Sequence, residues 1–263
     1  MPFVDIPGAR LFHRFDGPAD GPVVLLSNSL GTTHAMWEPQ MPALTRAFRV
    51  LRYDTRGHGH SSVPPGPYTI EALGRDALEL IDRLALPRIH VCGLSMGGMV
   101  AMWLAANAPA RIQRVVLANT SARIGVPEVW NRRIETVAAH GMGAIVDGVI
   151  ERWFTPGFRE RERGEVARIA KLLRGTDPAG YAACCAAVRD SDLLDSLAPI
   201  KAATLVIAGK HDAATPPDHA KAIVARIRGA RLATFDAAHL SNVECASSFT
   251  AALLDFLHAP PGS

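Results

Sequence analysis

The feature that most constrains the fold is the hexapeptide GLSMGG at residues 93–98, which lies between two apolar segments. The run Ile89–Cys92 before it predicts a buried strand, and Met96–Ala108 after it predicts a helix. A G-x-S-x-G sequence between a strand and a helix is typical of a sharp turn that exposes the serine hydroxyl at the top of a sheet. We expect glycine at Gly93 and Gly97 because a Cβ there would collide with the neighbouring strand or helix.

Further apolar runs bounded by turn residues alternate with helical patterns along the chain. The runs fit strands buried on both faces of a parallel sheet, and they are Pro22–Ser27, Phe48–Tyr53, Val115–Ala118, Thr204–Ala208 and Leu232–Phe235. The helical patterns are Ile70–Leu84, Pro217–Arg228 and Ser247–Leu257. This alternation predicts an α/β fold with a mostly parallel, doubly wound sheet. At the N-terminus, Phe3–Ile6 and Arg10–Phe15 predict a β-hairpin around Pro7-Gly8.

The interval between residues 118 and 204 breaks the alternation. It contains helical patterns such as Glu128–His140 and Gly143–Trp153 but no convincing strand, and it is far longer than one crossover needs. We therefore predict an inserted helical cap at residues 121–196, with residues 1–120 and 197–263 forming the core. We interpret the arginine-rich run Arg159–Arg168 as a solvated helix face.

The serine of the predicted turn needs partners, because a serine hydroxyl is a weak nucleophile without a base. In enzymes with this turn, an acid and then a histidine follow the serine along the chain. Asp212 and His239 each come shortly after a predicted strand. Both therefore belong at the carboxyl edge of the sheet, where catalytic groups gather in open α/β folds. We predict that Ser95, His239 and Asp212 form a catalytic triad.

Other acids and histidines nearby fit these roles less well. His211 adjoins Asp212 and is interpreted as a loop histidine that faces water. Asp218 and His219 fall within the next predicted helix and should point away from the edge. Asp236 is an alternative acid, but choosing it would leave Asp212 without an explanation.

A developing oxyanion requires preorganised N–H donors. One should be the backbone N–H of Met96, the residue after the nucleophile. The other should come from the loop after the strand Pro22–Ser27, and by position it is the backbone N–H of Leu30.

Charge and hydropathy exclude several partners. The net charge is only +3, and there is no basic run that would hold a phosphate backbone, so we expect no nucleic acid. The N-terminus lacks a basic segment followed by an apolar one, and no apolar run is long enough to span a membrane. We expect a cytoplasmic protein that does not bind a membrane.

The cysteines and the paired histidines of one loop do not predict a metal site. Cys92, Cys245 and the neighbours Cys184 and Cys185 have no C-x-x-C spacing, so we interpret them as small buried hydrophobic residues in a reducing compartment. In the loop after the strand 48–53, His58 and His60 lack a third ligand at suitable spacing.

Four segments, GLSMGG, YDTRGHGHS, GKHDAATPP and AAHLSNVE, together resemble the α/β-hydrolase superfamily over nearly the whole chain. A narrower resemblance is to the 3-oxoadipate enol-lactone hydrolases of the β-ketoadipate pathway. It is carried by SNSLGTTHAMWEPQ, GLSMGGMVAMWLA and the cap stretch Asp177–Leu193. Many α/β-hydrolases carry His-Gly where this chain has Asn28-Ser29, but a backbone amide can still supply the oxyanion donor.

The resemblance implies hydrolysis of 3-oxoadipate enol-lactone to 3-oxoadipate through an acyl-enzyme, with no cofactor and no metal. Two kinds of alternative stay open. The same triad serves general carboxylesterases, perhydrolase-like haloperoxidases and C–C bond hydrolases. A hydrolase-fold ligand receptor without catalysis is also conceivable, although a receptor need not keep nucleophile, acid and base at their strand ends.

The lactone implied by the resemblance is anionic, so a selective enzyme needs a cation or several donors over the pocket. The first helix of the predicted cap should roof the catalytic edge, and Trp130 and Arg133 share one face of it. We expect Trp130 to contact the flat lactone ring and Arg133 to bind the carboxylate. The alternative is that Trp130 packs the cap onto the core and Arg133 faces water, with Arg189 as the reserve cation.

Overall fold

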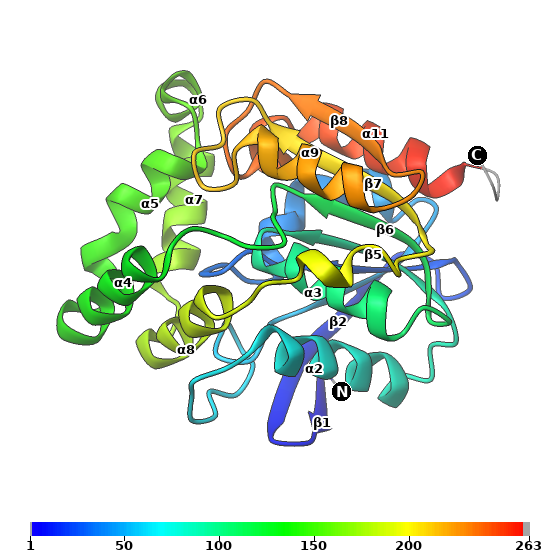
Figure 1. Cartoon of the computed structure of the whole chain (residues 1–263), viewed down its shortest axis with the longest axis horizontal. Coiled ribbons are helices and arrows are strands. Elements are labelled where there is room, and N and C mark those ends of the chain that lie inside the picture. The colour runs from blue at the N-terminus through cyan, green and yellow to red at the C-terminus, as the bar shows by residue number, and fades with distance from the viewer. Residues whose placement is uncertain (1, 260–263) are drawn as a thin grey trace.

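An eight-stranded sheet runs through the centre of the computed structural model, which describes residues 2–259 (Figure 1). The strand order is β1-β2-β4-β3-β5-β6-β7-β8. The pairings of β1 with β2 and of β2 with β4 are antiparallel, and all later pairings are parallel. The strands are β1 (Phe3–Ile6), β2 (Ala9–Asp16), β3 (Val23–Ser27), β4 (Arg49–Tyr53), β5 (Ile89–Leu94), β6 (Ile112–Ala118), β7 (Ala203–Gly209) and β8 (Arg231–Phe235). The predicted hairpin and the mostly parallel sheet are both confirmed.

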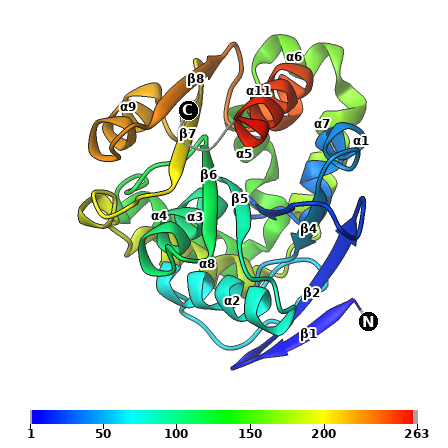
Figure 2. The same ribbon diagram turned by 90° about the vertical axis from the view of Figure 1, so that its right-hand side faces the viewer.

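Helices cover both faces of the sheet, as expected for a doubly wound fold. Figure 2 shows α2, α3 and α9 on one side of the strands and α1 and α11 on the other. These helices are α1 (Met41–Leu44), α2 (Ile70–Arg83), α3 (Met96–Asn107), α9 (Pro217–Arg226) and α11 (Ala246–His258). Outside residues 121–196, the sequence patterns did not predict three short elements: the 3-10 helix η1 (His34–Gln40), α1 and α10 (Ser241–Glu244).

Helix α2 shows how local sequence sets these elements. The Thr69 side chain caps its first turn by accepting a hydrogen bond from the Ala72 N–H at 3.0 Å. Its buried residues recur at helical spacing, so one face packs against the sheet and the neighbouring α3. By contrast, α3 is buried almost all round because it lies directly behind the central strands.

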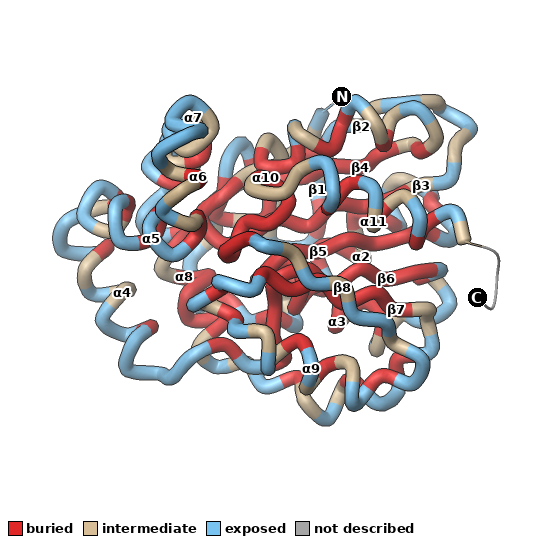
Figure 3. Tube along the Cα trace, turned by 90° about the horizontal axis from the view of Figure 1, so that it is seen from above, coloured by how far each residue is buried: buried red, intermediate tan, exposed pale blue. Residues whose placement is uncertain are grey.

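One expectation about the sheet is wrong. The central strands are buried along their length, as Figure 3 shows, but β8 is not buried on both faces. Leu232 on this strand is 41% exposed. The reason is position: β8 pairs only with β7, so it forms the edge of the sheet and is incompletely covered.

The chain between β6 and β7 folds into helices at one end of the sheet, where the carboxyl ends of the parallel strands lie (Figure 1). No strand forms in this interval, all of which lies within the described residues. The helices are α4 (Pro127–His140), η2 (Met142–Ile145), α5 (Val146–Trp153), α6 (Pro156–Arg161), α7 (Arg163–Arg174), α8 (Pro178–Arg189) and η3 (Leu194–Ser196). Residues of the arginine-rich run 159–168 are exposed or half-buried on α6 and α7.

Residues 2–259 allow the predictions about the cysteines, a metal site and a membrane-spanning helix to be compared with the structure. All cysteines of this part are free, with Cys92, Cys184 and Cys185 buried and Cys245 partly exposed. No group of three or more His, Cys, Asp or Glu side chains there is arranged to hold a metal ion. None of the helices formed by these residues has the length and apolar character needed to cross the bilayer.

Candidate active site

The turn between β5 and α3 holds Ser95 in a strained conformation. Its φ of 58° and ψ of −119° are unfavourable for a residue with a side chain, and such strain is common at functional positions. The Ser95 N–H donates to the Ala118 carbonyl on β6 at 3.0 Å, which fixes the turn against the sheet. A Cβ on Gly93 would clash with the Gly97 carbonyl, and a Cβ on Gly97 with the Ser27 carbonyl. The predicted need for both glycines is therefore confirmed.

Replacing Gly97 with alanine should lower the free energy of unfolding by about 3 kcal/mol, because the new methyl group must displace the backbone of β3. A matched control is Gly148→Ala on α5, where a Cβ would meet no atom within 4 Å. That substitution should stabilise the protein slightly, by up to about 1 kcal/mol, because alanine favours a helix. Urea unfolding of both variants checks the pair. Equal stability of the two variants would contradict the close approach at Gly97.

The loops after β7 and β8 bring Asp212 and His239 together. His239 Nδ1 and Asp212 Oδ2 are 2.8 Å apart, and both side chains are almost fully buried. Burial by itself would raise the pKa of Asp212. The charge of His239 and hydrogen bonds from His239 and Thr215 outweigh this effect and lower the pKa to about 2. The Asp212 carboxylate is therefore ionised at neutral pH.

Two residues that support Asp212 were missed by sequence reasoning. Asn119 donates from Nδ2 to Asp212 Oδ2 at 3.0 Å, and the Thr215 hydroxyl donates to the same oxygen at 2.7 Å. The N–H groups of Ala214 and Thr215 donate to the other carboxylate oxygen at 2.8 and 2.9 Å. Asn119 directly follows β6. The strand-end argument that selected Asp212 and His239 would therefore have selected Asn119 as well.

The rival residues lie elsewhere. His211 Nε2 and Asp236 Oδ1 are 2.9 Å apart at the surface, where both side chains are more than half exposed. Asp218 and His219 belong to α9, and Asp218 pairs with Lys221 on the same helix. None of these residues lines the cavity that contains Ser95.

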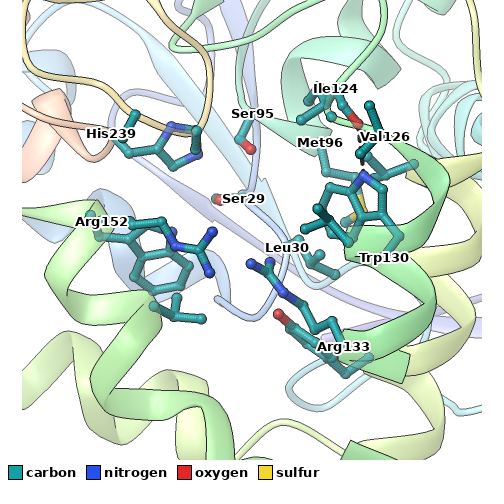
Figure 4. A pocket seen from close by; sticks show the side chains of 18 residues that line it. Ser29, Leu30, Ser95, Met96, Ile124, Val126, Trp130, Arg133, Arg152 and His239 are labelled. Atoms are coloured by element: carbon teal, nitrogen blue, oxygen red, sulfur yellow. Dashed lines mark hydrogen bonds between the residues drawn. The ribbon is translucent and has the colours of Figure 1, made fainter. Parts of the chain in front are cut away.

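A cavity of about 290 Å³ lies between the sheet edge and the inserted helices, and all the predicted site residues except Asp212 line it. Ser95 and His239 lie at one end, and the guanidinium groups of Arg133 and Arg152 point toward one another at the other end (Figure 4). Aspartate and glutamate are absent from its lining. The remaining lining residues are mainly apolar and include Ile124, Val126, Val129, Val149, Trp153 and Val188.

Leu30 and Met96 both line this cavity. Among residues 2–259, the Leu30 N–H has no acceptor, and the Met96 N–H lies in the first turn of α3, where a helix provides none. The next amide in the loop is occupied, since the Gly31 N–H donates to His58 Nε2 at 2.9 Å. Burial lowers the pKa of His58 to about 4, so its ring is neutral and able to accept this bond. His58 thus has a structural role in this loop.

The structure places Trp130 and Arg133 at the cavity, as the helical spacing predicts. Trp130 is 8% exposed, its Nε1–H donates to the Ile124 carbonyl at 2.7 Å, and the residue lines the cavity. The Arg133 guanidinium lies 4.9 Å from the centre of that ring. Arg189, the reserve candidate for binding the substrate carboxylate, does not line the cavity. It pairs with Asp190 and donates to Asn131 instead.

Arg152 on α5 is the second cation of the cavity, and sequence reasoning missed it. In the described part of the chain, neither Arg152 nor Arg133 has a carboxylate within 4.0 Å of its guanidinium nitrogens. Burial, and then the positive charge of Arg133, lower the pKa of Arg152. The first effect reflects the partial burial of Arg152, and the second reflects the like charge of Arg133 beside it. The sequence signal was weak, because Arg152 is one of many arginines in the inserted helices and its position over the cavity depends on how α4 and α5 pack.

The sheet order, the strained serine turn and the Asp212–His239 pair at the strand ends together define an α/β-hydrolase. A family model described as the alpha/beta hydrolase fold matches residues 22–245, and the chain belongs to this family of enzymes. It is 40% identical to 3-oxoadipate enol-lactonase 2 of Acinetobacter baylyi, over 90% of this chain and 89% of the relative. It is also 32% identical to a putative carbamate hydrolase RutD of Variovorax paradoxus, over 94% and 96% of the two chains.

Among solved structures, the enol-lactonase from Burkholderia xenovorans LB400 superposes with a TM-score of 0.97. It shares 47% sequence identity with this chain, and the match covers 98% of this chain and 100% of that one. The predicted resemblance to the α/β-hydrolases and to enol-lactonases among them is therefore confirmed.

Proposed function

We propose that the protein hydrolyses 3-oxoadipate enol-lactone to 3-oxoadipate. The observation that carries the proposal is the polarity of the cavity: Ser95 and His239 lie at one end, and two arginines without carboxylate partners lie at the other. A small lactone with a free carboxylate matches this arrangement, because its ring can reach the serine while its carboxylate binds the arginines. The similarity to enol-lactonases supports the same substrate.

In the proposed reaction, Ser95 Oγ attacks the lactone carbonyl carbon and His239 accepts the serine proton. The backbone N–H groups of Leu30 and Met96 donate to the oxyanion of the tetrahedral intermediate. The bond from the carbonyl carbon to the ring oxygen then breaks, and His239 returns the proton to that oxygen. The leaving enol stays attached to the acyl chain and tautomerises to the ketone. Asp212 orients His239 and stabilises its protonated form.

Deacylation repeats these roles with water as the nucleophile. His239 accepts a proton from water as the water oxygen adds to the acyl carbon. The ester bond to Ser95 then breaks, His239 returns the proton to Ser95 Oγ, and the new carboxyl group is released and ionises. No cofactor enters either half of the reaction.

We further propose that residues 121–196 act as a cap on a core formed by residues 1–120 and 197–263. The cap supplies Trp130, Arg133 and Arg152 to the cavity, whereas the core supplies Ser95 and His239. A hydrogen bond from the Leu240 N–H to the Trp153 carbonyl, at 3.1 Å, joins the cap to the histidine loop. Substrate selection thus resides in the cap and bond cleavage in the core.

A substrate panel on the purified protein tests the proposal. It should contain the enol-lactone, a neutral lactone of similar size, an aryl ester, a vinylogous diketone and an alkyl carbamate. We expect kcat/KM to be highest for the enol-lactone by at least about 100-fold, which is the range that paired charged contacts provide. A higher value for the neutral ester, the diketone or the carbamate would replace the proposal with esterase, C–C hydrolase or carbamate hydrolase activity.

Charge removal at Arg133 tests how the carboxylate is bound. Arg133→Met should lower kcat/KM on the enol-lactone, and the loss should correspond to roughly 1.5 to 3 kcal/mol of transition-state stabilisation. The value of kcat/KM on the neutral lactone should change little. Arg152→Met should act in the same direction. The matched control is Arg132→Met, since Arg132 is an exposed neighbour on α4 that does not line the cavity. Equal losses on both lactones would instead assign Arg133 a structural role.

A further inference from the structure

The hydroxyl group of Ser29 is an unexplained polar group in the cavity. Ser29 is 1% exposed and lines the cavity together with Ser95 and Leu30. Figure 4 shows its oxygen pointing into the cavity, on the side where Ser95 lies. In residues 2–259 no donor or acceptor forms a hydrogen bond with this hydroxyl. The hydroxyl oxygen is open to the cavity, so it is free to form a hydrogen bond with a ligand bound there.

The backbone around this hydroxyl is held in place. The Ser29 N–H donates to Met36 Sδ at 3.3 Å, and the Ser29 carbonyl accepts from the Thr32 N–H at 3.1 Å and from the Thr32 hydroxyl at 2.7 Å. The neighbouring Asn28 side chain is also fixed, because it donates to the Tyr53 carbonyl at 2.6 Å and accepts from Trp37 Nε1 at 2.9 Å. The Ser29 side chain is thus presented to the cavity from a preorganised loop.

The position of Ser29 in the sequence places its hydroxyl beside one of the proposed oxyanion donors. Ser29 directly precedes Leu30 in the loop after β3, where a glycine would offer no side chain. Here a hydroxyl stands one residue before Leu30, whose free N–H lines the same cavity. In the proposed reaction the Leu30 N–H donates to the oxyanion, and the Ser29 hydroxyl faces the same cavity.

We infer that the Ser29 hydroxyl is a third donor to the oxyanion, beside the N–H groups of Leu30 and Met96. The inference rests on the proposed function, because it requires Ser95 to attack a carbonyl carbon. Ser29 keeps its proton throughout: it donates a hydrogen bond to the carbonyl oxygen as the bond from Ser95 Oγ to the carbon forms, and the bond weakens when the carbonyl is restored. A fixed donor of this kind stabilises the transition state more than the bound substrate.

The test compares Ser29→Ala with the unmodified protein on p-nitrophenyl acetate and on the enol-lactone. We expect kcat to fall at least about tenfold on both substrates, toward the 100-fold to 1000-fold effect of a single oxyanion donor, while KM changes less than about threefold. Ser29→Thr keeps a hydroxyl and should retain most of the activity. Ser29→Gly removes the whole side chain, should match Ser29→Ala, and covers the case in which alanine disturbs the loop.

A transition-state analogue provides a second readout. An arylboronic acid forms a tetrahedral adduct with a serine nucleophile, so its inhibition constant should weaken in Ser29→Ala by about the same factor as kcat. The matched control is Ser27→Ala, because the Ser27 hydroxyl is buried and already paired with the Tyr53 hydroxyl at 2.9 Å. This control should lose stability but change kcat less than about threefold.

Separate outcomes distinguish the inference from the proposed function. A Ser29→Ala variant with unchanged kcat, or with a change confined to KM, would overturn the role of Ser29. If Ser95→Ala were inactive in the same experiment, the assignment of Ser95 as the nucleophile would still stand. An active Ser95→Ala variant would overturn both.

Discussion

Ser95→Ala should lose nearly all turnover, with kcat lower by a factor on the order of 10⁵ or more, while the protein stays folded. The alanine methyl group occupies less space than the serine side chain, so the strained turn and its hydrogen bond to β6 are kept. What disappears is the only hydroxyl at the start of α3 that can form the acyl-enzyme. The loss of turnover is measured by steady-state hydrolysis of an aryl ester and of the enol-lactone, and the retained fold is measured by urea unfolding.

The double variant separates a shared mechanism from independent contributions. If Ser95 and His239 act as nucleophile and base, removing both should be little worse than removing either one. Losses that multiply would mean that the two residues contribute separately, and the acyl-enzyme mechanism would have to be abandoned. Labelling with a fluorophosphonate provides a direct check, because it should modify the unaltered protein and fail with Ser95→Ala.

Asp212→Asn should lower kcat by a factor on the order of 10⁴. The asparagine keeps the size of the side chain, but its amide can donate to His239 Nδ1 and favour the tautomer whose other nitrogen cannot accept the serine proton. The Asp212 carboxylate is held in place by Asn119, by Thr215 and by the adjacent N–H groups. The substitution should therefore alter mainly the charge at position 212 and the tautomer of His239, and not the position of the side chain.

Two further measurements sharpen this prediction. Because the pKa of Asp212 is lowered to about 2, the carboxylate is ionised throughout the assay range, and the loss should persist from about pH 5 to about pH 8. Asp236→Asn is the matched control, since Asp236 is exposed and pairs with His211 away from the cavity. It should change kcat less than about twofold. A large loss for Asp236→Asn and a small one for Asp212→Asn would exchange the roles of the two acids.

The strands, most helices and the turn at Ser95 could be predicted because their signals are local. Alternation of period two or of 3.6 residues reports which residues face the core, and G-x-S-x-G reports a backbone turn that only glycines at both flanks permit. The exception among the strands was β8, whose apolar residues predicted full burial. Its exposure depends on its place at the sheet edge, and strand order is not a local property.

The sequence by itself determined the α/β fold, the helical interval between β6 and β7, and the positions of Ser95, Asp212 and His239 at strand ends. Those positions follow because parallel strands carry their carboxyl ends to one common edge. Only the tertiary structure decided which side chains come together around that edge: that Arg152 faces Arg133, that Arg189 donates to Asn131 outside the cavity, and that the Ser29 hydroxyl faces the cavity. These outcomes depend on how helices pack and which hydrogen bonds neighbouring loops already satisfy, and residues far apart in the chain make those contacts.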